Sequence, residues 1–115
     1  MRELSVMVAI FFYIMFYLYL LYSAKAKKFY IGYSSDPYKR LQQHLNNKGD
    51  KYTGKYNDWK LQAVFKISES RAEALRIEKF IKRQKSRKLL ELLCEPDFVP
   101  VGKLAQLVRV PQVRD

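Results

Sequence analysis

An uncharged, strongly apolar run from Leu4 to Tyr22 limits what this chain can fold into more than any other segment. Its length approaches the roughly 20 apolar residues that a helix needs to cross a bilayer. Lys25, Lys27 and Lys28 follow it, as expected for a cytoplasmic flank. A membrane anchor is therefore one interpretation of the run.

The tyrosines of the run favour another interpretation. They are spread through its second half, whereas membrane tyrosines gather at the interfaces, and they are Tyr13, Tyr17, Tyr19 and Tyr22. A segment rich in Tyr, Phe and Leu is also typical of a strand buried on both faces. If residues 16–22 form that strand, Leu4 to Met15 is too short to span a bilayer. Residues 1–14 then form an apolar N-terminal extension, and Met15 offers an alternative start of translation.

The remaining pattern predicts one α/β domain of the α+β type, with a small three-stranded antiparallel sheet flanked by helices. Three strands are expected, at Phe16–Tyr22, Lys28–Tyr33 and Trp59–Ile67. Three helices are expected, at residues 37–46, 71–84 and 86–93. Asp36 and Ser86 suit N-caps, and Ser70 with Glu73 has the spacing of a capping box.

The domain is expected to cover residues 15–94 and to be followed by a tail over 95–115. Pro96 and Pro100 break regular structure at the start of that tail. Two alternatives remain open for the rest of it. The tail is either disordered, or Leu104, Leu107 and Val108 form the apolar side of a short helix.

The net charge of +11 is concentrated inside the folded part. Between Lys25 and Lys88 there are 18 Lys and Arg residues against 6 Asp and Glu residues. A basic block of this kind points to a polyanion, with nucleic acid first and anionic lipid second. Eight cations are expected to grip a phosphate backbone: Lys48, Lys51, Lys55, Lys82, Arg83, Lys85, Arg87 and Lys88. Tyr52, Tyr56 or Trp59 could stack on an unpaired base.

Cys94 is the only cysteine, so the chain has no internal disulfide and no thiolate zinc site. This fits a reducing cytoplasm. A lone cysteine on an apolar helix face is expected to be a small core residue.

Residues for phosphodiester chemistry occur at suggestive spacings. Hydrolysis needs a base for the attacking water, a cation for the phosphate oxygens and usually a divalent metal. Arg40 and His44 are one helical turn apart on one face. Arg40 can donate two hydrogen bonds to a phosphate, and His44 can donate to it or help to relay a proton. Each residue alone is equally typical of an ordinary helix.

Glu78 is the unusual residue of the helix over 71–84. It extends the apolar stripe of Ala74, Ile77 and Ile81, where a carboxylate should be half-buried and needs a partner. That partner is either Lys82, four residues on, or Mg²⁺ held by one carboxylate, phosphate oxygens and water.

Together these motifs resemble the GIY-YIG endonuclease superfamily, and small standalone bacterial members in particular. The resemblance rests on Tyr17-Leu18-Tyr19, Tyr30-Ile31-Gly32, Arg40, His44 and Glu78, in this order. It covers about residues 15–93. The chain departs from the family pattern in the first motif, where Tyr17 replaces glycine and Leu18 replaces isoleucine.

The resemblance also implies roles. Tyr19 would be the general base or would orient the water, and Tyr30 would assist it and contact the phosphate. Arg40 would stabilise the pentavalent phosphate and His44 would support proton transfer. Glu78 would bind one Mg²⁺ or Mn²⁺ ion. Gly32 would let backbone and substrate approach closely.

We therefore expect a cytoplasmic, metal-dependent endonuclease that cleaves duplex or branched DNA in repair or recombination. No small-molecule cofactor, obligate protein partner or membrane is expected. Without an added DNA-reading module, its choice of target stays open. Two alternatives are a non-catalytic nucleic-acid-binding module and a protein anchored in a membrane through residues 4–22.

Overall fold

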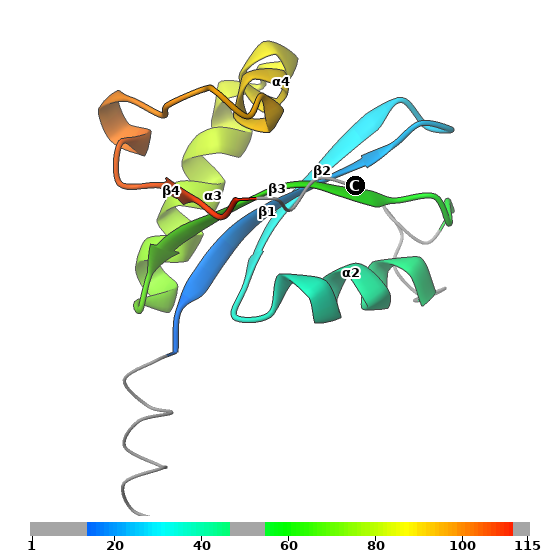
Figure 1. Cartoon of the computed structure of the whole chain (residues 1–115), viewed down its shortest axis with the longest axis horizontal. Helices are drawn as coiled ribbons and strands as arrows, with labels where there is room; N and C mark the ends of the chain where they lie inside the picture. Colours follow the sequence, from blue (N-terminus) through cyan, green and yellow to red (C-terminus); the bar gives the residue numbers. More distant parts are fainter. Residues whose placement is uncertain (1–13, 47–54, 112–115) are drawn as a thin grey trace, which may run out of the picture.

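The computed structural model describes residues 14–46 and 55–111. Four strands form one antiparallel sheet in the order β2-β1-β3-β4: β1 (Phe16–Ser23), β2 (Lys28–Ser34), β3 (Lys60–Ser68) and β4 (Val108–Arg109). Helix α2 (Pro37–Asn46) lies on one face, and α3 (Arg71–Gln84) and α4 (Arg87–Cys94) lie on the other (Figure 1). The predicted α+β class, with helices flanking an antiparallel sheet, is confirmed.

Strand β1 is the centre of the molecule because it pairs with both β2 and β3. Leu18 and Leu20 are fully buried on the face that carries α3 and α4, while Tyr19 and Leu21 are buried on the face that carries α2. The second half of the apolar run is thus a strand buried on both faces, as its composition predicted. Within the described residues, no helix is both long and apolar enough to cross a membrane.

The two faces of the sheet support separate cores. The larger core joins β1, β3 and α3 through residues such as Phe65 and Ile77, and it includes Cys94, which is buried as predicted. The smaller core lies under α2 and includes Tyr19, Trp59 and Leu61. Burial of apolar area in both cores holds β1 in a fixed position relative to α2 and α3.

The prediction of three strands is wrong, because the tail contributes β4. Val108 and Arg109 pair with β3, and a 3₁₀ helix, η1 (Gly102–Leu104), comes before them. Leu104 and Leu107 are buried in the larger core. A strand of two residues is too short to show an alternating pattern in the sequence. Packing of the two leucines holds it in place. Neither alternative for the tail, disorder or an amphipathic α-helix, describes residues 101–111.

Side-chain caps fix where the helices begin. The Lys39 amide donates to Asp36 Oδ1 at 3.1 Å, and the Leu89 amide donates to Ser86 Oγ at 3.0 Å, as predicted.

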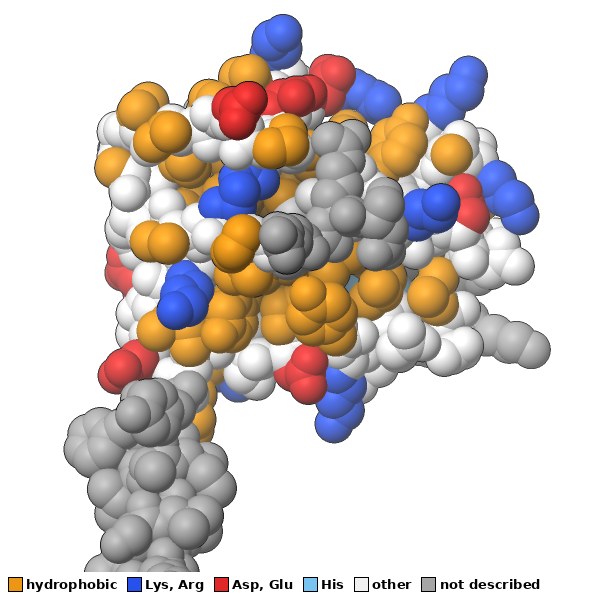
Figure 2. Space-filling model, in the orientation of Figure 1, with side chains coloured by type: hydrophobic (Ala, Val, Ile, Leu, Met, Phe, Trp, Pro, Cys, Tyr) orange, Lys and Arg blue, Asp and Glu red, His pale blue; other side chains and the backbone are white. Residues whose placement is uncertain are grey.

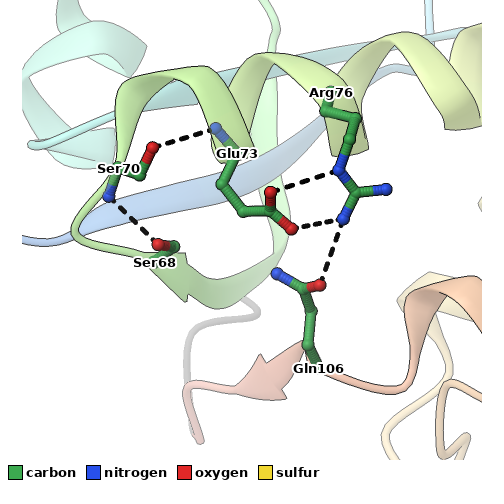
Figure 3. Close-up of polar contacts among 5 residues, drawn as sticks. All are labelled: Ser68, Ser70, Glu73, Arg76 and Gln106. Atoms are coloured by element: carbon green, nitrogen blue, oxygen red, sulfur yellow. Dashed lines mark hydrogen bonds and ion pairs between the residues drawn. The ribbon is translucent and has the colours of Figure 1, made fainter.

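The capping box at the start of α3 is only half formed (Figure 3). The Glu73 amide donates to Ser70 Oγ at 3.2 Å, but the Ser70 amide donates to Ser68 Oγ. The Glu73 carboxylate instead pairs with Arg76. Arg76 also donates to Gln106 at 3.3 Å, which links α3 to the tail.

Candidate active site

The site is built around the pairing of Tyr19 on β1 with Gly32 on β2. A Cβ atom at position 32 would lie 2.5 Å from the Tyr19 hydroxyl oxygen and 2.7 Å from Cζ. The phenol therefore occupies the space that any side chain at position 32 would need. The structure shows a close approach of Gly32 to Tyr19, and Gly32 also lines the cavity described below. The expected close approach of substrate to Gly32 stays a prediction.

His44 on α2 forms a hydrogen bond with Tyr19. The Tyr19 hydroxyl oxygen and His44 Nε2 are 2.9 Å apart, and both side chains are buried. Either atom can be the donor, according to the tautomer of the imidazole. The His44 ring also lies 4.5 Å from the Tyr30 ring, centroid to centroid. His44 thus contacts both tyrosines within the α2 side of the molecule.

A cavity of about 360 Å³ brings together residues from four elements. The predicted site residues that line it are Tyr19, Tyr30, Gly32, Arg40 and Glu78. The remaining one, His44, is absent from this lining and contacts it through Tyr19. Tyr19 and Glu78, which are 59 positions apart in the sequence, therefore meet at one cavity of a size that ligands occupy.

The cavity is also lined by Arg71, a cation that the sequence motifs did not predict as a site residue. Its guanidinium carbon lies 4.9 Å from the centroid of the Phe16 ring and 6.0 Å from that of Tyr33. The sequence marks Arg71 only as the first residue of α3. Arg71 reaches the cavity because α3 packs against β1 and β2, and the sequence spacing gives no indication of that packing.

Burial and a hydrogen bond set the charge states of Tyr19 and Arg40. Burial raises the pKa of Tyr19 to about 12, against an opposing effect of the hydrogen bond from Arg40. The same interaction with Tyr19, more than that with Tyr30, raises the pKa of Arg40. At neutral pH Tyr19 is therefore a neutral hydroxyl next to a fixed positive charge.

The raised pKa of Tyr19 predicts a loss of stability in alkaline solution. Because the folded pKa exceeds the ordinary value of 10.0, this contribution is complete below pH 10 and is lost as the pH rises toward 12. Between pH 9 and pH 12 the free energy of unfolding should fall by about 2 to 3 kcal/mol more in the parent than in Tyr19→Phe. Urea titrations at several pH values measure this, with the exposed Tyr38→Phe as the control. Parallel curves for parent and Tyr19→Phe would contradict the assignment.

Glu78 is half-buried, as predicted, with 13% of its side chain exposed. Lys82 Nζ donates to Glu78 Oε1 at 2.7 Å. Of the two partners considered for this carboxylate, Lys82 and Mg²⁺, Lys82 is therefore the one that the structure shows. Half of the Lys82 side chain is exposed, whereas the Glu78 carboxylate is largely buried. Lys82 can therefore leave Glu78 at small cost only where another cation takes its place beside the carboxylate.

The surroundings of Glu78 fit a magnesium ion held by one protein carboxylate. In the described ranges, no three or more His, Cys, Asp or Glu side chains cluster in a way that could enclose a metal. Mg²⁺ is commonly bound through one or two carboxylates together with substrate phosphates and water. Glu78 lies on the same cavity as Arg40, which can bind the phosphate.

The cations expected to bind DNA are on the surface wherever the structure describes them. Six of them are exposed: Lys55, Lys82, Arg83, Lys85, Arg87 and Lys88. Lys48, Lys51 and Tyr52 lie outside the described residues. Trp59 is 3% exposed, so its expected stacking on a base is wrong, because the indole fills the core under α2. On the face shown in Figure 2, scattered Lys and Arg side chains lie among Asp and Glu side chains and a patch of apolar ones.

The sequence model of the GIY-YIG catalytic domain matches residues 15–90, from the start of β1 to within α4. The chain therefore belongs to the GIY-YIG family, a group of nucleases that act on DNA. It is also 34% identical over 82 residues to the UPF0213 protein FN1575 of Fusobacterium nucleatum subsp. nucleatum. That similarity covers 71% of this chain and 80% of the relative.

Proposed function

We propose that the protein is a DNA endonuclease that depends on Mg²⁺ or Mn²⁺. The observation that carries the proposal is the single cavity lined by Tyr19, Tyr30, Arg40 and Glu78. These four side chains offer a hydroxyl pair, a cation and a carboxylate within one small volume. Membership of a nuclease family supports the same reaction.

Tyr19 and His44 would act together on the attacking water. A neutral Tyr19 cannot accept a proton without passing on its own, and His44 Nε2 is 2.9 Å from its oxygen. With the imidazole proton on Nδ1, Tyr19 gives its proton to Nε2 and takes one from water. The resulting hydroxide attacks phosphorus, and the bond to the leaving sugar oxygen breaks with its electron pair staying on that oxygen, which then takes a proton from solvent.

Arg40 would stabilise the phosphate as negative charge accumulates on its oxygens. Its guanidinium already faces the two tyrosine hydroxyls, so it needs little reorganisation to bind an anion there. Tyr30 can donate a further hydrogen bond, and Arg71 adds a second positive charge to the cavity. Glu78 would hold the divalent ion, which supplies charge neutralisation at the leaving oxygen when bound.

The exposed cations on α3 and α4 would bind the DNA backbone without regard to sequence. Duplex or branched DNA in repair or recombination is the substrate that we propose. The buried lone thiol of Cys94 is compatible with work in a reducing cytoplasm.

Nicking of supercoiled plasmid with Mg²⁺ tests the proposal. We expect Arg40→Ala to cut about 10²-fold more slowly than the parent protein, because one preorganised donor to the transition state is lost. Lys39→Ala, at the neighbouring exposed position of α2, is the matched control and should cut at the parental rate. Equal rates for all three proteins would remove Arg40 from the site. Salt-sensitive binding without turnover under either metal would indicate a non-catalytic DNA-binding module.

A further inference from the structure

We propose that a groove beside the catalytic cavity binds one unpaired nucleotide of the DNA substrate. The groove lies between β2 and the junction of α3 with α4 and has a volume of about 380 Å³. The proposal rests on the proposed function and narrows its substrate to DNA that carries unpaired nucleotides next to the cleavage site.

Charge identifies the occupant as an anion. Four cations line the groove: Lys28 on β2, Lys82 and Lys85 at the end of α3, and Arg87 at the start of α4. Neither Asp nor Glu is among the described residues that form its wall. A concave surface that carries charge of one sign concentrates ions of the opposite sign. The phosphate of a nucleotide is such an anion.

The floor of the groove identifies the other half of the occupant. It is apolar, with Ile31 and Ile81 buried and Phe29 and Leu90 half-buried. The Arg87 guanidinium lies 5.3 Å from the centroid of the Phe29 ring, and Arg87 Nη1 donates to the Lys27 carbonyl at 2.7 Å. Apolar floors and fixed guanidinium planes are surfaces on which unpaired bases stack. A paired base cannot use them, because its neighbours in the duplex cover both of its faces.

Lys85 gives independent support because its backbone is in an unfavourable conformation. It ends α3 with φ at 47°, in the left-handed region that glycine or asparagine usually occupies at this position. A lysine there costs stability that glycine would not, and such residues tend to occur at functional sites. Lys85 contributes a positive charge to the groove, and a role in binding an anion there would account for a lysine at this position.

Lys82 joins the groove to the catalytic cavity. Its side chain lines the groove, and its Nζ atom donates to Glu78, which lines the cavity. A nucleotide in the groove would therefore be close to a phosphate bound between Arg40 and Glu78. One strand of DNA can then occupy both sites at once.

Fluorescence anisotropy with the full chain in EDTA tests this without cleavage. The probes are a labelled blunt duplex and the same duplex with a single-stranded flap. We expect the parent protein to bind the flap DNA about tenfold more tightly, as stacking of one base allows. Lys85→Gly should remove most of this preference without lowering the thermal midpoint, because glycine suits the left-handed conformation. Lys28→Gln, at a regular strand position, should weaken the preference in the same way.

Lys60→Gln is the matched control, since Lys60 is exposed on β3 and outside the groove. It should keep the parental preference. Equal affinity of the parent for both DNAs, or a preference that persists in Lys85→Gly and Lys28→Gln, would overturn the proposal. A preference in EDTA without any nicking in Mg²⁺ would retain the groove and reject the nuclease function. Nicking in Mg²⁺ without a preference for flap DNA would retain the nuclease function and reject the groove.

Discussion

Replacing Glu78 with glutamine should lower the rate of DNA cleavage in Mg²⁺ by about 10³-fold, the effect of losing several kcal/mol of metal-derived stabilisation. Glutamine keeps the size of the side chain in its half-buried place on α3 but removes the negative charge. The amide can still accept a hydrogen bond from Lys82, so the fold should change little. The rate of plasmid nicking, measured under single-turnover conditions, gives the size of the loss.

Two further measurements separate a metal role for Glu78 from a structural one. Glu78→Gln should bind DNA in EDTA as the parent does, and it should bind Mn²⁺ more weakly in a titration followed by electron paramagnetic resonance. Glu91→Gln makes the same change at an exposed position of α4 and should leave cleavage unchanged. Unaltered Mn²⁺ binding by Glu78→Gln would show that the carboxylate serves only as the partner of Lys82.

Gly32→Ala should abolish cleavage and destabilise the fold by about 1 to 3 kcal/mol, the usual cost of overpacking a filled site. The added methyl group would lie 2.5 Å from the Tyr19 hydroxyl oxygen. The ring cannot easily move away, because Tyr19 is 1% exposed and its hydroxyl is hydrogen-bonded to His44. Chemical denaturation and the nicking assay measure the two effects on the same protein.

A double-mutant cycle identifies the source of that cost. In a Tyr19→Ala background the phenol is gone, so the additional substitution Gly32→Ala should cost much less free energy. An equal cost in both backgrounds would place the clash elsewhere, for example in the backbone of β2 itself.

Much of the fold could be predicted because its signals are local. The apolar composition of residues 16–22, the caps at Asp36 and Ser86, and the apolar stripe of α3 each act over a few residues. Strand β4 could not be predicted in this way. Two residues carry no period, and β4 is held by the burial of Leu104 and Leu107 against distant elements.

The candidate site also has features that the local sequence predicts and features that depend on packing. The family resemblance, carried by short motifs on predictable elements, named five of the residues that the cavity gathers: Tyr19, Tyr30, Gly32, Arg40 and Glu78. It could not find Arg71, which reaches the cavity only through the way α3 packs. Nor could it reveal that burial keeps Tyr19 neutral, since burial is a property of the assembled sheet and helices. The groove around Lys85 likewise exists only where β2 meets the junction of α3 and α4.

The pairing of Tyr19 with Gly32 has a consequence for when the protein could act. A slip of one residue between β1 and β2 would place a side chain, from Ile31 or Tyr33, opposite the phenol. Only the native alignment leaves room for the ring and keeps its oxygen beside His44. A partly folded chain would still carry the positive charges that attract DNA, but it would lack the means to cut it. Correct strand alignment would thus make the proposed cleavage of DNA depend on completed folding.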